Sequence, residues 1–348
     1  MNTSSMLQGP LNPVLKPEHK LRHDVFSTPK HPGSICVANY KGGVGKTTVT
    51  CLLGYYLAEL TGKRVLLFDI DPQCSLSLAL GFDPEAVSKT ELTIYNLVRP
   101  TKWTKIRKTN FSQYVTKVPD SLAPDKLSII KGSFDVEELD MEIAASVSGQ
   151  NARRVDELFL YCKQMMDAFD TFDYIIVDCP PNKMFLTQAM LQACSFYLPV
   201  TIPDVISSYG MPRLLRWVKK IPVADRPLFL GYVLNVINRT GGPPGGKVTS
   251  QQSAHARLDR SIQLDLEQIE KDVIRGKPTI GVIPRLDAIA RFLGEQGAKF
   301  SRYEFSRHTS GQPSIEECLT AITKETIKRM DTYHAQTSHR PSPGSKPA

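Results

Sequence analysis

Paired cysteines are what this sequence most clearly lacks. Seven cysteines are scattered over 348 residues, and no two of them stand in a Cys-x-x-Cys arrangement. Most of them lie in apolar runs, which favours buried free thiols in a reducing compartment over a disulfide framework. The spacing that is typical of a cysteine-bound metal cluster is also missing.

Long hydrophobic runs are absent as well. No apolar run approaches the roughly 18 residues that a membrane-spanning helix needs, and residues 1–5 are not a charged segment followed by an apolar one. We therefore expect neither a transmembrane segment nor a signal peptide, and we find no internal repeat. An apolar content of 41% is enough for a large core and compatible with a single α/β domain.

A glycine-rich stretch at 41–48 stands between an apolar run at 34–39 and an apolar-periodic stretch from 49 to about 60. This order predicts a strand, a tight turn and a helix. Such a turn directs backbone N–H groups into one concave space at a helix N-terminus, where the helix dipole favours an anion. Glycines allow the close approach of phosphate oxygens. Lys46 is expected to reach the β- and γ-phosphates and Thr47 to bind Mg²⁺. The residues expected to bind the nucleotide here are Lys41, Gly42, Gly43, Val44, Gly45, Lys46, Thr47 and Thr48.

The stretch departs from the general P-loop pattern G-x-x-x-x-G-K-[ST] at one position. The pattern has glycine where this chain has Tyr40, and a second lysine, Lys41, directly precedes Gly42. In these residues the chain resembles the deviant Walker A box, K-G-G-x-G-K-[ST]-T, of the ParA/MinD family of P-loop ATPases. The alternative, a glycine-rich turn with a stray lysine, is disfavoured because seven specified residues fall in a strand–turn–helix context.

Two acidic motifs follow predicted buried strands. The run 65–68 leads into Asp69-Ile-Asp71-Pro-Gln, and the run 174–177 leads into Asp178-Cys-Pro-Pro. Ligands gather at the carboxyl ends of strands in α/β sheets, so these carboxylates are placed for chemistry. The motifs resemble the second box, D-x-D-P-Q, and the Walker B motif, hhhhD-x-P-P, of the same family.

The resemblance covers about 34–330 and implies a function for each carboxylate. It implies ATP and Mg²⁺ as cofactors, Mg²⁺ binding by Thr47, Asp69 and Asp178, and positioning of the attacking water by Asp71. An Asp-Pro turn that caps the next helix is a structural alternative at Asp71, and the two readings are compatible. At 182–183 the chain has Asn-Lys, where relatives more often carry small residues.

The chain order predicts an α/β fold, with a doubly wound, mostly parallel sheet and helices on both faces. We expect a tail at 1–33, one ATPase domain at 34–333 with an irregular segment at 81–125, and a disordered tail at 334–348. Further strands are predicted at 127–130, 196–201 and 229–237. Further helices are predicted at 136–146, 152–169, 251–272 and 314–330, with another after 209–212.

The resemblance also implies residues around the adenine, where relatives place an Asn or Asp after a strand and residues that follow an Ile-Pro pair. Asn238 and Pro284 occupy those places in this chain. A lone Asn after a strand is also common turn chemistry.

Positive charge is concentrated in the second half of the chain. The formal net charge is +8, and residues 205–304 contain sixteen Lys and Arg against nine Asp and Glu. Residues 102–108 form a second basic cluster. Such an excess on a nucleotide-binding fold suggests a polyanionic partner, with solvated surface charge as the alternative. The candidate DNA contacts are Arg239, Lys247, Arg257, Arg285 and Arg291, although Arg285 could serve the nucleotide and Arg257 could be a solvated helix residue.

The resemblance implies a switch ATPase in which Lys41 crosses the interface of an ATP-dependent homodimer. Lys41, Lys46 and Asp71 are then the catalytic residues. The leading hypothesis is a ParA-like ATPase, cytoplasmic and nucleoid-associated, that binds DNA without sequence preference and responds to a ParB-like or cargo-linked activator. A MinD-like membrane-associated regulator would need a terminal amphipathic basic helix, whereas the chain ends in a Ser/Pro-rich segment. A metabolic or metal-cluster ATPase of the same fold would need a dedicated substrate pocket or paired cysteines, and the sequence shows neither clearly.

Overall fold

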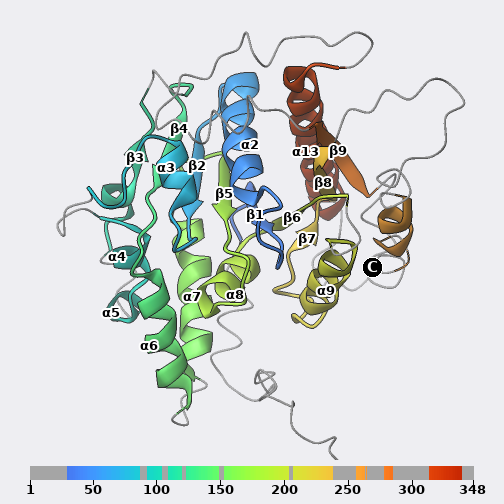
Figure 1. Ribbon diagram of the computed structural model, residues 1–348. Helices are drawn as coiled ribbons and strands as arrows, with labels where there is room; N and C mark the ends of the chain where they lie inside the picture. The colour runs from blue at the N-terminus through green and yellow to red at the C-terminus, as the bar shows by residue number, and fades with distance from the viewer. Residues whose placement is uncertain are drawn as a thin grey trace, which may run out of the picture.

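The computed structural model describes residues 30–86, 92–103, 109–119, 123–148, 153–203, 207–237, 256–262, 264, 278–284 and 313–338. These residues build one nine-stranded sheet in the order β3-β4-β2-β5-β1-β6-β8-β9, with β7 paired to β6 (Figure 1). Neighbouring strands are parallel except for the β3–β4 pair. The strands are β1 Ser34–Ala38, β2 Val65–Asp69, β3 Thr116–Lys117, β4 Leu127–Ile130, β5 Tyr174–Asp178, β6 Phe196–Thr201, β7 Leu228–Phe229, β8 Tyr232–Ile237 and β9 Thr279–Pro284.

The middle strands of the sheet are buried on both faces. Every residue of β1, β2, β5 and β6 is buried. Alternate side chains feed two separate cores, as the two-residue period of a strand requires. Cys36 and Phe68 belong to one core, whereas Ile35 and Leu67 belong to the other. The continuous apolar runs in the sequence are explained by this double coverage.

Helices cover both faces of the sheet. One face packs against α2 Lys46–Thr61, α3 Ser75–Ala79 and α13 Ile315–Ser338. The other packs against α4 Ile94–Val98, α5 Pro100–Trp103, the 3₁₀ turn η2 Phe111–Tyr114, α6 Val136–Ser148, α7 Arg153–Asp167, α8 Phe185–Ala193 and α9 Ser207–Val218. The predicted doubly wound α/β fold is thereby confirmed.

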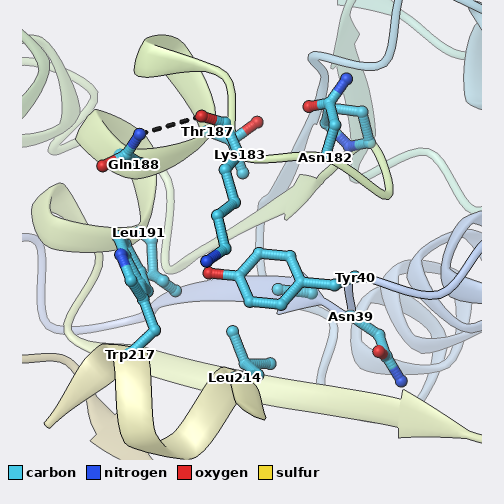
Figure 2. Close-up of a pocket in the computed structure, with 11 residues that line it drawn as sticks. Asn39, Tyr40, Asn182, Lys183, Thr187, Gln188, Leu191, Leu214 and Trp217 are labelled. Carbon is cyan, nitrogen blue, oxygen red and sulfur yellow. Dashed lines mark hydrogen bonds between the residues drawn. The ribbon is translucent and has the colours of Figure 1, made fainter. Parts of the chain in front are cut away.

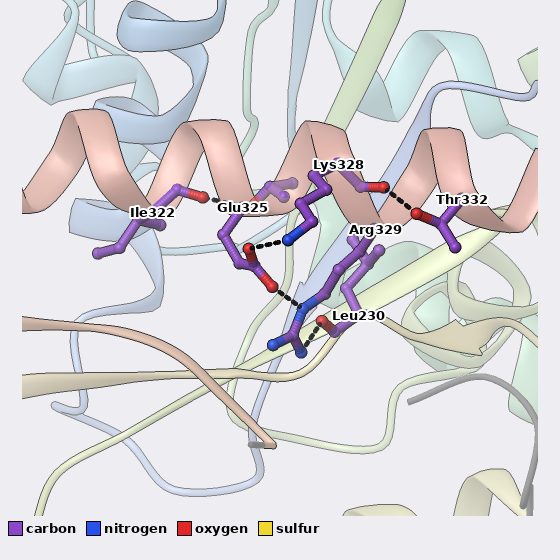
Figure 3. A network of polar contacts seen from close by, with 7 residues as sticks. Leu230, Ile322, Glu325, Lys328, Arg329 and Thr332 are labelled. Atoms are coloured by element: carbon purple, nitrogen blue, oxygen red, sulfur yellow. Dashed lines mark hydrogen bonds and ion pairs between the residues drawn. The ribbon is translucent and has the colours of Figure 1, made fainter. Parts of the chain in front are cut away.

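The last helix is fixed to the sheet by polar as well as apolar contacts (Figure 3). Arg329 donates from Nη1 to the Leu230 carbonyl oxygen at 2.8 Å and from Nε to Glu325 Oε1 at 2.8 Å. Lys328 lies on the exposed side, with its Nζ 3.9 Å from Glu325 Oε2. The helix continues to Ser338, past the predicted domain boundary at 333, and His334 is hydrogen-bonded to the Pro32 carbonyl at 3.1 Å.

The described part of the predicted N-terminal tail is also tied to the domain. His31 is buried and hydrogen-bonded to the Phe172 carbonyl at 2.9 Å. Lys30 donates from Nζ to the carbonyl oxygens of Cys194 and Asp225 at 3.0 and 2.7 Å. This attachment could not be predicted from the low aliphatic content of 1–33, because polar groups form the contacts.

Element boundaries differ from the predictions where glycine or a turn intervenes. The single strand expected at 229–237 is split into β7 and β8 at Gly231, whose φ of +109° only glycine adopts readily. A Cβ there would lie 2.3 Å from Arg329 Nη1 and 2.6 Å from the Pro278 carbonyl oxygen. The segment 81–125 contains the short elements α4, α5, η2 and β3 where it is described. Of the helix expected at 251–272, the described residues 256–262 are helical.

Candidate nucleotide-binding site

The glycine-rich stretch forms the predicted turn between β1 and α2. Gly43 and Gly45 have φ values of +70° and +91°, in the left-handed region that favours glycine. Gly45 is the N-cap residue of α2, and the helix begins at Lys46 with a Val49 N–H to Gly45 carbonyl bond of 2.9 Å. The loop therefore ends at a helix N-terminus, as an anion site requires.

Two asparagines hold the loop, and neither was predicted from the sequence to belong to the site. The Asn39 side chain accepts from the Lys41 backbone N–H at 3.1 Å and donates to the Val200 carbonyl at 2.7 Å. Asn235 donates from Nδ2 to the Val44 carbonyl at 2.9 Å. Both are buried, so their hydrogen bonds to backbone are made away from water. Their signal in the sequence is a polar residue at the end of, or inside, an otherwise apolar strand.

The two lysines of the loop lie in different settings. Lys46 is 6% exposed, and its Nζ donates to the Lys41 carbonyl oxygen at 3.4 Å. Burial lowers the pKa of Lys46, and the charges of Asp178 and Asp71 oppose that shift. Lys41 is only half-buried. The structure thus folds one lysine over the loop and leaves the other nearer the surface.

Asp69 and Asp178 stand next to each other at the carboxyl ends of β2 and β5, paired in register and fully buried. Asp178 accepts from Thr50 Oγ1 at 3.3 Å through Oδ1, whereas its buried Oδ2 has no hydrogen-bond partner. Burial, and then the charge of Asp69, raise the pKa of Asp178 to about 8. Thr47 lowers the pKa of Asp178 against these two effects, so Thr47 also lies near this carboxylate.

Asp69 is held by the helix that follows it. Its Oδ2 accepts from the backbone N–H and the hydroxyl of Ser77 at 2.8 and 2.6 Å, while its buried Oδ1 has no partner. Burial raises the pKa of Asp69 to about 6 against the effect of these hydrogen bonds. Gly132 donates from its N–H to Ser77 Oγ at 2.8 Å, and a Cβ at Gly132 would lie 2.9 Å from Asp69 Oδ2. The end of β4 therefore approaches this carboxylate closely.

Asp71 is 9% exposed and caps its own turn. Its Oδ1 accepts from the Gln73 N–H at 3.0 Å, and its carbonyl accepts from the Cys74 N–H at 2.8 Å. The Asp-Pro turn considered in the sequence analysis is therefore present. The charge of Asp71 acts on both Lys46 and Asp178, which places it within the same site.

These residues fit a magnesium ion that is bound together with a nucleotide. Asp69 Oδ1 and Asp178 Oδ2 are buried oxygens without a partner, and a cation would satisfy them. In the described part of the chain, no group of three or more His, Cys, Asp or Glu forms a metal site alone. Mg²⁺ commonly takes one or two carboxylates and completes its shell with phosphate and water oxygens. Thr47, Asp69 and Asp178 would hold it, and its charge would offset that of the phosphates.

The two departures from the family pattern contact each other beside this site (Figure 2). Lys183 Nζ lies 4.8 Å from the ring centroid of Tyr40, and the Tyr40 ring meets Trp217 edge-on at 6.4 Å. Gln188 on α8 donates to the Lys183 carbonyl at 2.9 Å. Together they line a small pocket next to the loop, with Asn39, Asn182, Leu191 and Leu214 among its other residues.

Several predicted contacts cannot be placed. Asn238, Arg239, Lys247, Arg285 and Arg291 lie outside the described residues. Pro284 ends β9, is buried, and pairs with Ile237, the residue before Asn238. Arg257 is exposed on the helical segment 256–262. The ends of β8 and β9 thus lie side by side, as the adenine prediction requires.

All seven cysteines are free and six of them are buried, in agreement with their positions in apolar runs of the sequence. None of the helices described here is long and apolar enough to cross a membrane.

Comparisons with known proteins agree with this geometry. A family model described as an AAA domain matches residues 33–227, more than half of the chain. The chromosome-partitioning ATPase Soj of Treponema pallidum is 32% identical over 192 residues, which are 54% of this chain and 64% of Soj. A replication protein A candidate of Rhizobium rhizogenes is 32% identical over 219 residues, 60% of this chain. The chain spans about half the length of the curated relatives of this second kind, 51% in that case.

A solved structure has the same fold. The ATP complex of the Cyanothece McdA D38A variant superposes with a TM-score of 0.63 at 20% identity, over 86% of this chain and 98% of McdA. On the strength of the three motifs, their placement at one edge of the sheet and these matches, the chain belongs to the ParA/MinD family of P-loop ATPases.

Proposed function

We propose that this chain is a ParA-like switch ATPase. It binds ATP with Mg²⁺, dimerises on ATP, binds DNA without sequence preference and positions DNA or another cargo. A partner protein, ParB-like or cargo-linked, stimulates its slow hydrolysis and releases it. Its expected location is the cytoplasm, on the nucleoid. The observation that carries the proposal is the different placement of Lys46 and Lys41 in one loop.

The buried lysine suits binding in its own subunit. Lys46 is nearly enclosed and is directed along its own loop, so it serves the phosphates bound there. Lys41 precedes two exposed glycines and is itself half-buried. A cation at that position can reach a nucleotide held by a second copy. Charge supplied in this way stabilises the transferring phosphoryl group and makes dimerisation depend on ATP.

The three carboxylates of the site have different roles in metal binding and hydrolysis. Asp69 and Asp178 have oxygens left over for Mg²⁺. Asp71 is buried at 9% exposure and its charge acts on Lys46 and Asp178, and from this position it can orient a water toward the γ-phosphate. Positioning and electrostatic stabilisation are the main contributions that a protein makes to phosphoryl transfer.

The partition part of the proposal rests on the relatives. The Treponema pallidum protein is named for chromosome partitioning, and a Caulobacter vibrioides relative named chromosome partitioning protein ParA is 29% identical over 211 residues. The basic second half of this chain supports a polyanionic partner.

The experiment is sedimentation velocity of the full chain with a non-hydrolysable ATP analogue and Mg²⁺. The wild type is expected to dimerise, whereas Lys41→Ala should remain monomeric while binding the analogue with nearly wild-type affinity. Lys63→Ala, which removes an exposed cation beyond the other end of α2, is the matched control and should dimerise normally. Normal dimerisation of Lys41→Ala would contradict the role in trans. Binding to anionic liposomes with ATP, and none to DNA at low salt, would favour a MinD-like membrane regulator.

A further inference from the structure

A second basic surface lies on α9 and the loop that faces it, apart from the DNA contacts that the sequence suggested. Arg213 and Arg216 are exposed on α9, and Lys219 and Lys220 are exposed in the turn that follows. Lys183 adjoins them from the loop after β5. We call these five side chains the α9 basic surface.

Within the described part of the chain, the charges of this surface are not balanced by ion pairs with carboxylates. Among the residues that the structure describes, no Asp or Glu forms an ion pair with any of the five. The segment 207–220 contains no acidic residue at all. Burial, and then the charges of Arg213 and Lys220, lower the pKa of Lys183. Like charges that lie this close repel one another, so an anion bound here would be favoured.

The geometry of the helix places the cations on one side. Residues 213, 216 and 220 follow the three- and four-residue spacing of a helix face. The Lys219 N–H bonds to the Leu215 carbonyl at 2.9 Å, so the helical path continues into the turn. At a rise of 1.5 Å per residue the cations from Arg213 to Lys220 span about 10 Å. That length corresponds to about three phosphates of one DNA strand along the duplex axis.

The opposite side of α9 is already used by the core. Met211, Leu214, Leu215 and Val218 are at most 2% exposed. Over residues 211–218, whose burial the structure describes, the helix therefore has no free apolar face to insert into a lipid bilayer. Nor does the surface offer the exposed apolar centre of a typical protein–protein interface, since Trp217 is half-buried against Tyr40. A surface that is cationic and poor in apolar area has the composition of a DNA interface.

We propose that the α9 basic surface binds the phosphate backbone of DNA. This inference rests on the proposed function and deepens it, because it names residues for the DNA contact that differ from the sequence candidates. Lys183 lies over the ring of Tyr40, the residue before Lys41. A phosphate held by Lys183 is therefore bound beside the nucleotide loop, where DNA and ATP can affect each other's binding.

The test measures binding of the full chain to fluorescently labelled duplexes of two unrelated sequences, with the ATP analogue, over a series of salt concentrations. The triple variant Arg213→Ala, Arg216→Ala, Lys220→Ala should bind both duplexes at least about tenfold more weakly near 0.1 M salt. Its log–log salt slope should fall by about 0.9 for each phosphate that the variant no longer neutralises. Affinity for the ATP analogue and the unfolding temperature should not change.

The matched control is Lys328→Ala, which removes an exposed cation from α13, on the other face of the sheet (Figure 3). It should keep the wild-type affinity and slope. If the triple variant melts at a lower temperature, Arg213→Ala and Lys220→Ala are measured singly, and each should still reduce the slope.

Four outcomes are informative. A wild type that binds no DNA with ATP at any salt concentration overturns the DNA part of the proposed function, and this inference with it. If the wild type binds DNA and the triple variant binds it with the same affinity and the same salt slope, this inference alone is overturned. If the triple variant loses binding to polyglutamate that the wild type shows, while its DNA affinity is unchanged, the surface binds an acidic protein and this inference is overturned as well. The reduced slope in the triple variant, with the control unchanged, supports it.

Discussion

Asp69 and Asp178 lie opposite each other on the paired strands β2 and β5, and neither side chain is exposed. Each keeps one buried oxygen without a hydrogen-bond partner. Burial disfavours the ionised form of both carboxylates, and the charge of Asp69 adds to this effect at Asp178, so their pKa values are raised to about 6 and about 8. The pair therefore costs the protein stability when both are charged and no cation is bound.

The metal-free protein should become less stable as the pH rises. The pKa values of both groups in the folded protein are above their ordinary value of 3.8. Between about pH 4 and about pH 8 the folded state thus holds protons that the unfolded state has released, and the free energy of unfolding falls with pH. Urea unfolding in EDTA at several pH values would measure this.

Asp178→Asn isolates the contribution of one carboxylate. The variant should approach wild-type stability near pH 4 and exceed it by a growing margin toward pH 8, because the amide never ionises. With Mg²⁺ and nucleotide present, the wild type should be more stable than Asp178→Asn, because its ionised carboxylate binds the cation. Parallel pH curves for the two proteins would show that the pair does not titrate in this range.

Gly45→Ala should damage the nucleotide loop. The φ of +91° at this position is strained for alanine, and the added Cβ would lie 2.0 Å from Asn235 Nδ2. The strain costs about 1–3 kcal/mol, and relief of the clash requires Asn235 to release the Val44 carbonyl. We expect loss of ATP binding together with a lower unfolding temperature. Gly62→Ala is the control, because its φ of +64° brings similar strain at the far end of α2 without a clash. It should lose stability but keep ATP affinity.

The sequence was sufficient for the elements whose signals are local. The strand, turn and helix around 41–48 followed from glycines and apolar periodicity, and β2, β4, β5 and β6 from continuous apolar runs. Asp69, Asp71 and Asp178 could be placed at one edge because parallel strands end together. The glycine and lysine positions of the loop were predicted for the same local reasons.

The features of the fold and the site that could not be predicted depend on contacts between distant segments of the chain. Asn235 supports a loop 191 positions away, which no local pattern indicates. Ser77 reaches Asp69 through a turn of the chain, and Gly132 joins them from a third segment. The strand β3 has two residues, and the sequence of β9 contains Gly281 within its apolar run and ends in proline, so neither has the length or pattern that predicts an independent strand. The contact between Tyr40 and Lys183 was also hidden, although both residues were noted separately as departures.

A buried ion pair between α7 and the segment after α9 provides a further test of stability. Lys163 Nζ lies 3.0 Å from Asp225 Oδ1, with the side chains 2% and 5% exposed. Lys163→Met should destabilise the protein by about 3–5 kcal/mol, because it leaves a buried carboxylate without its partner. Lys163→Met with Asp225→Leu should cost much less than the sum of the single changes. Urea unfolding of the three variants measures the coupling, and additive costs would show that the two charges do not stabilise each other.

Asp71→Ala should separate ATP binding from hydrolysis. The side chain belongs to the turn after β2 and not to the nucleotide loop, so removal of its carboxylate leaves Lys46, Thr47 and the loop backbone in place. The variant should bind ATP with nearly wild-type affinity and hydrolyse it at least about a hundredfold more slowly, since one positioned polar group contributes about 10²–10⁴ to a rate. It should also accumulate as the ATP-bound dimer. Lys46→Ala is the contrasting variant and should fail to bind ATP at all.

Single-turnover hydrolysis and equilibrium binding of a fluorescent ATP analogue distinguish the two variants. Asp71→Asn adds a further control, because it preserves the hydrogen bond that Asp71 Oδ1 accepts from the Gln73 N–H. If Asp71 serves only to hold the turn through this hydrogen bond, Asp71→Asn should behave like the wild type. If its carboxylate orients a water, Asp71→Asn should hydrolyse ATP slowly. Hydrolysis at the wild-type rate by Asp71→Asn would therefore assign Asp71 to the turn rather than to the reaction. Slow hydrolysis by both Asp71 variants, with ATP binding retained, would assign the carboxylate to catalysis.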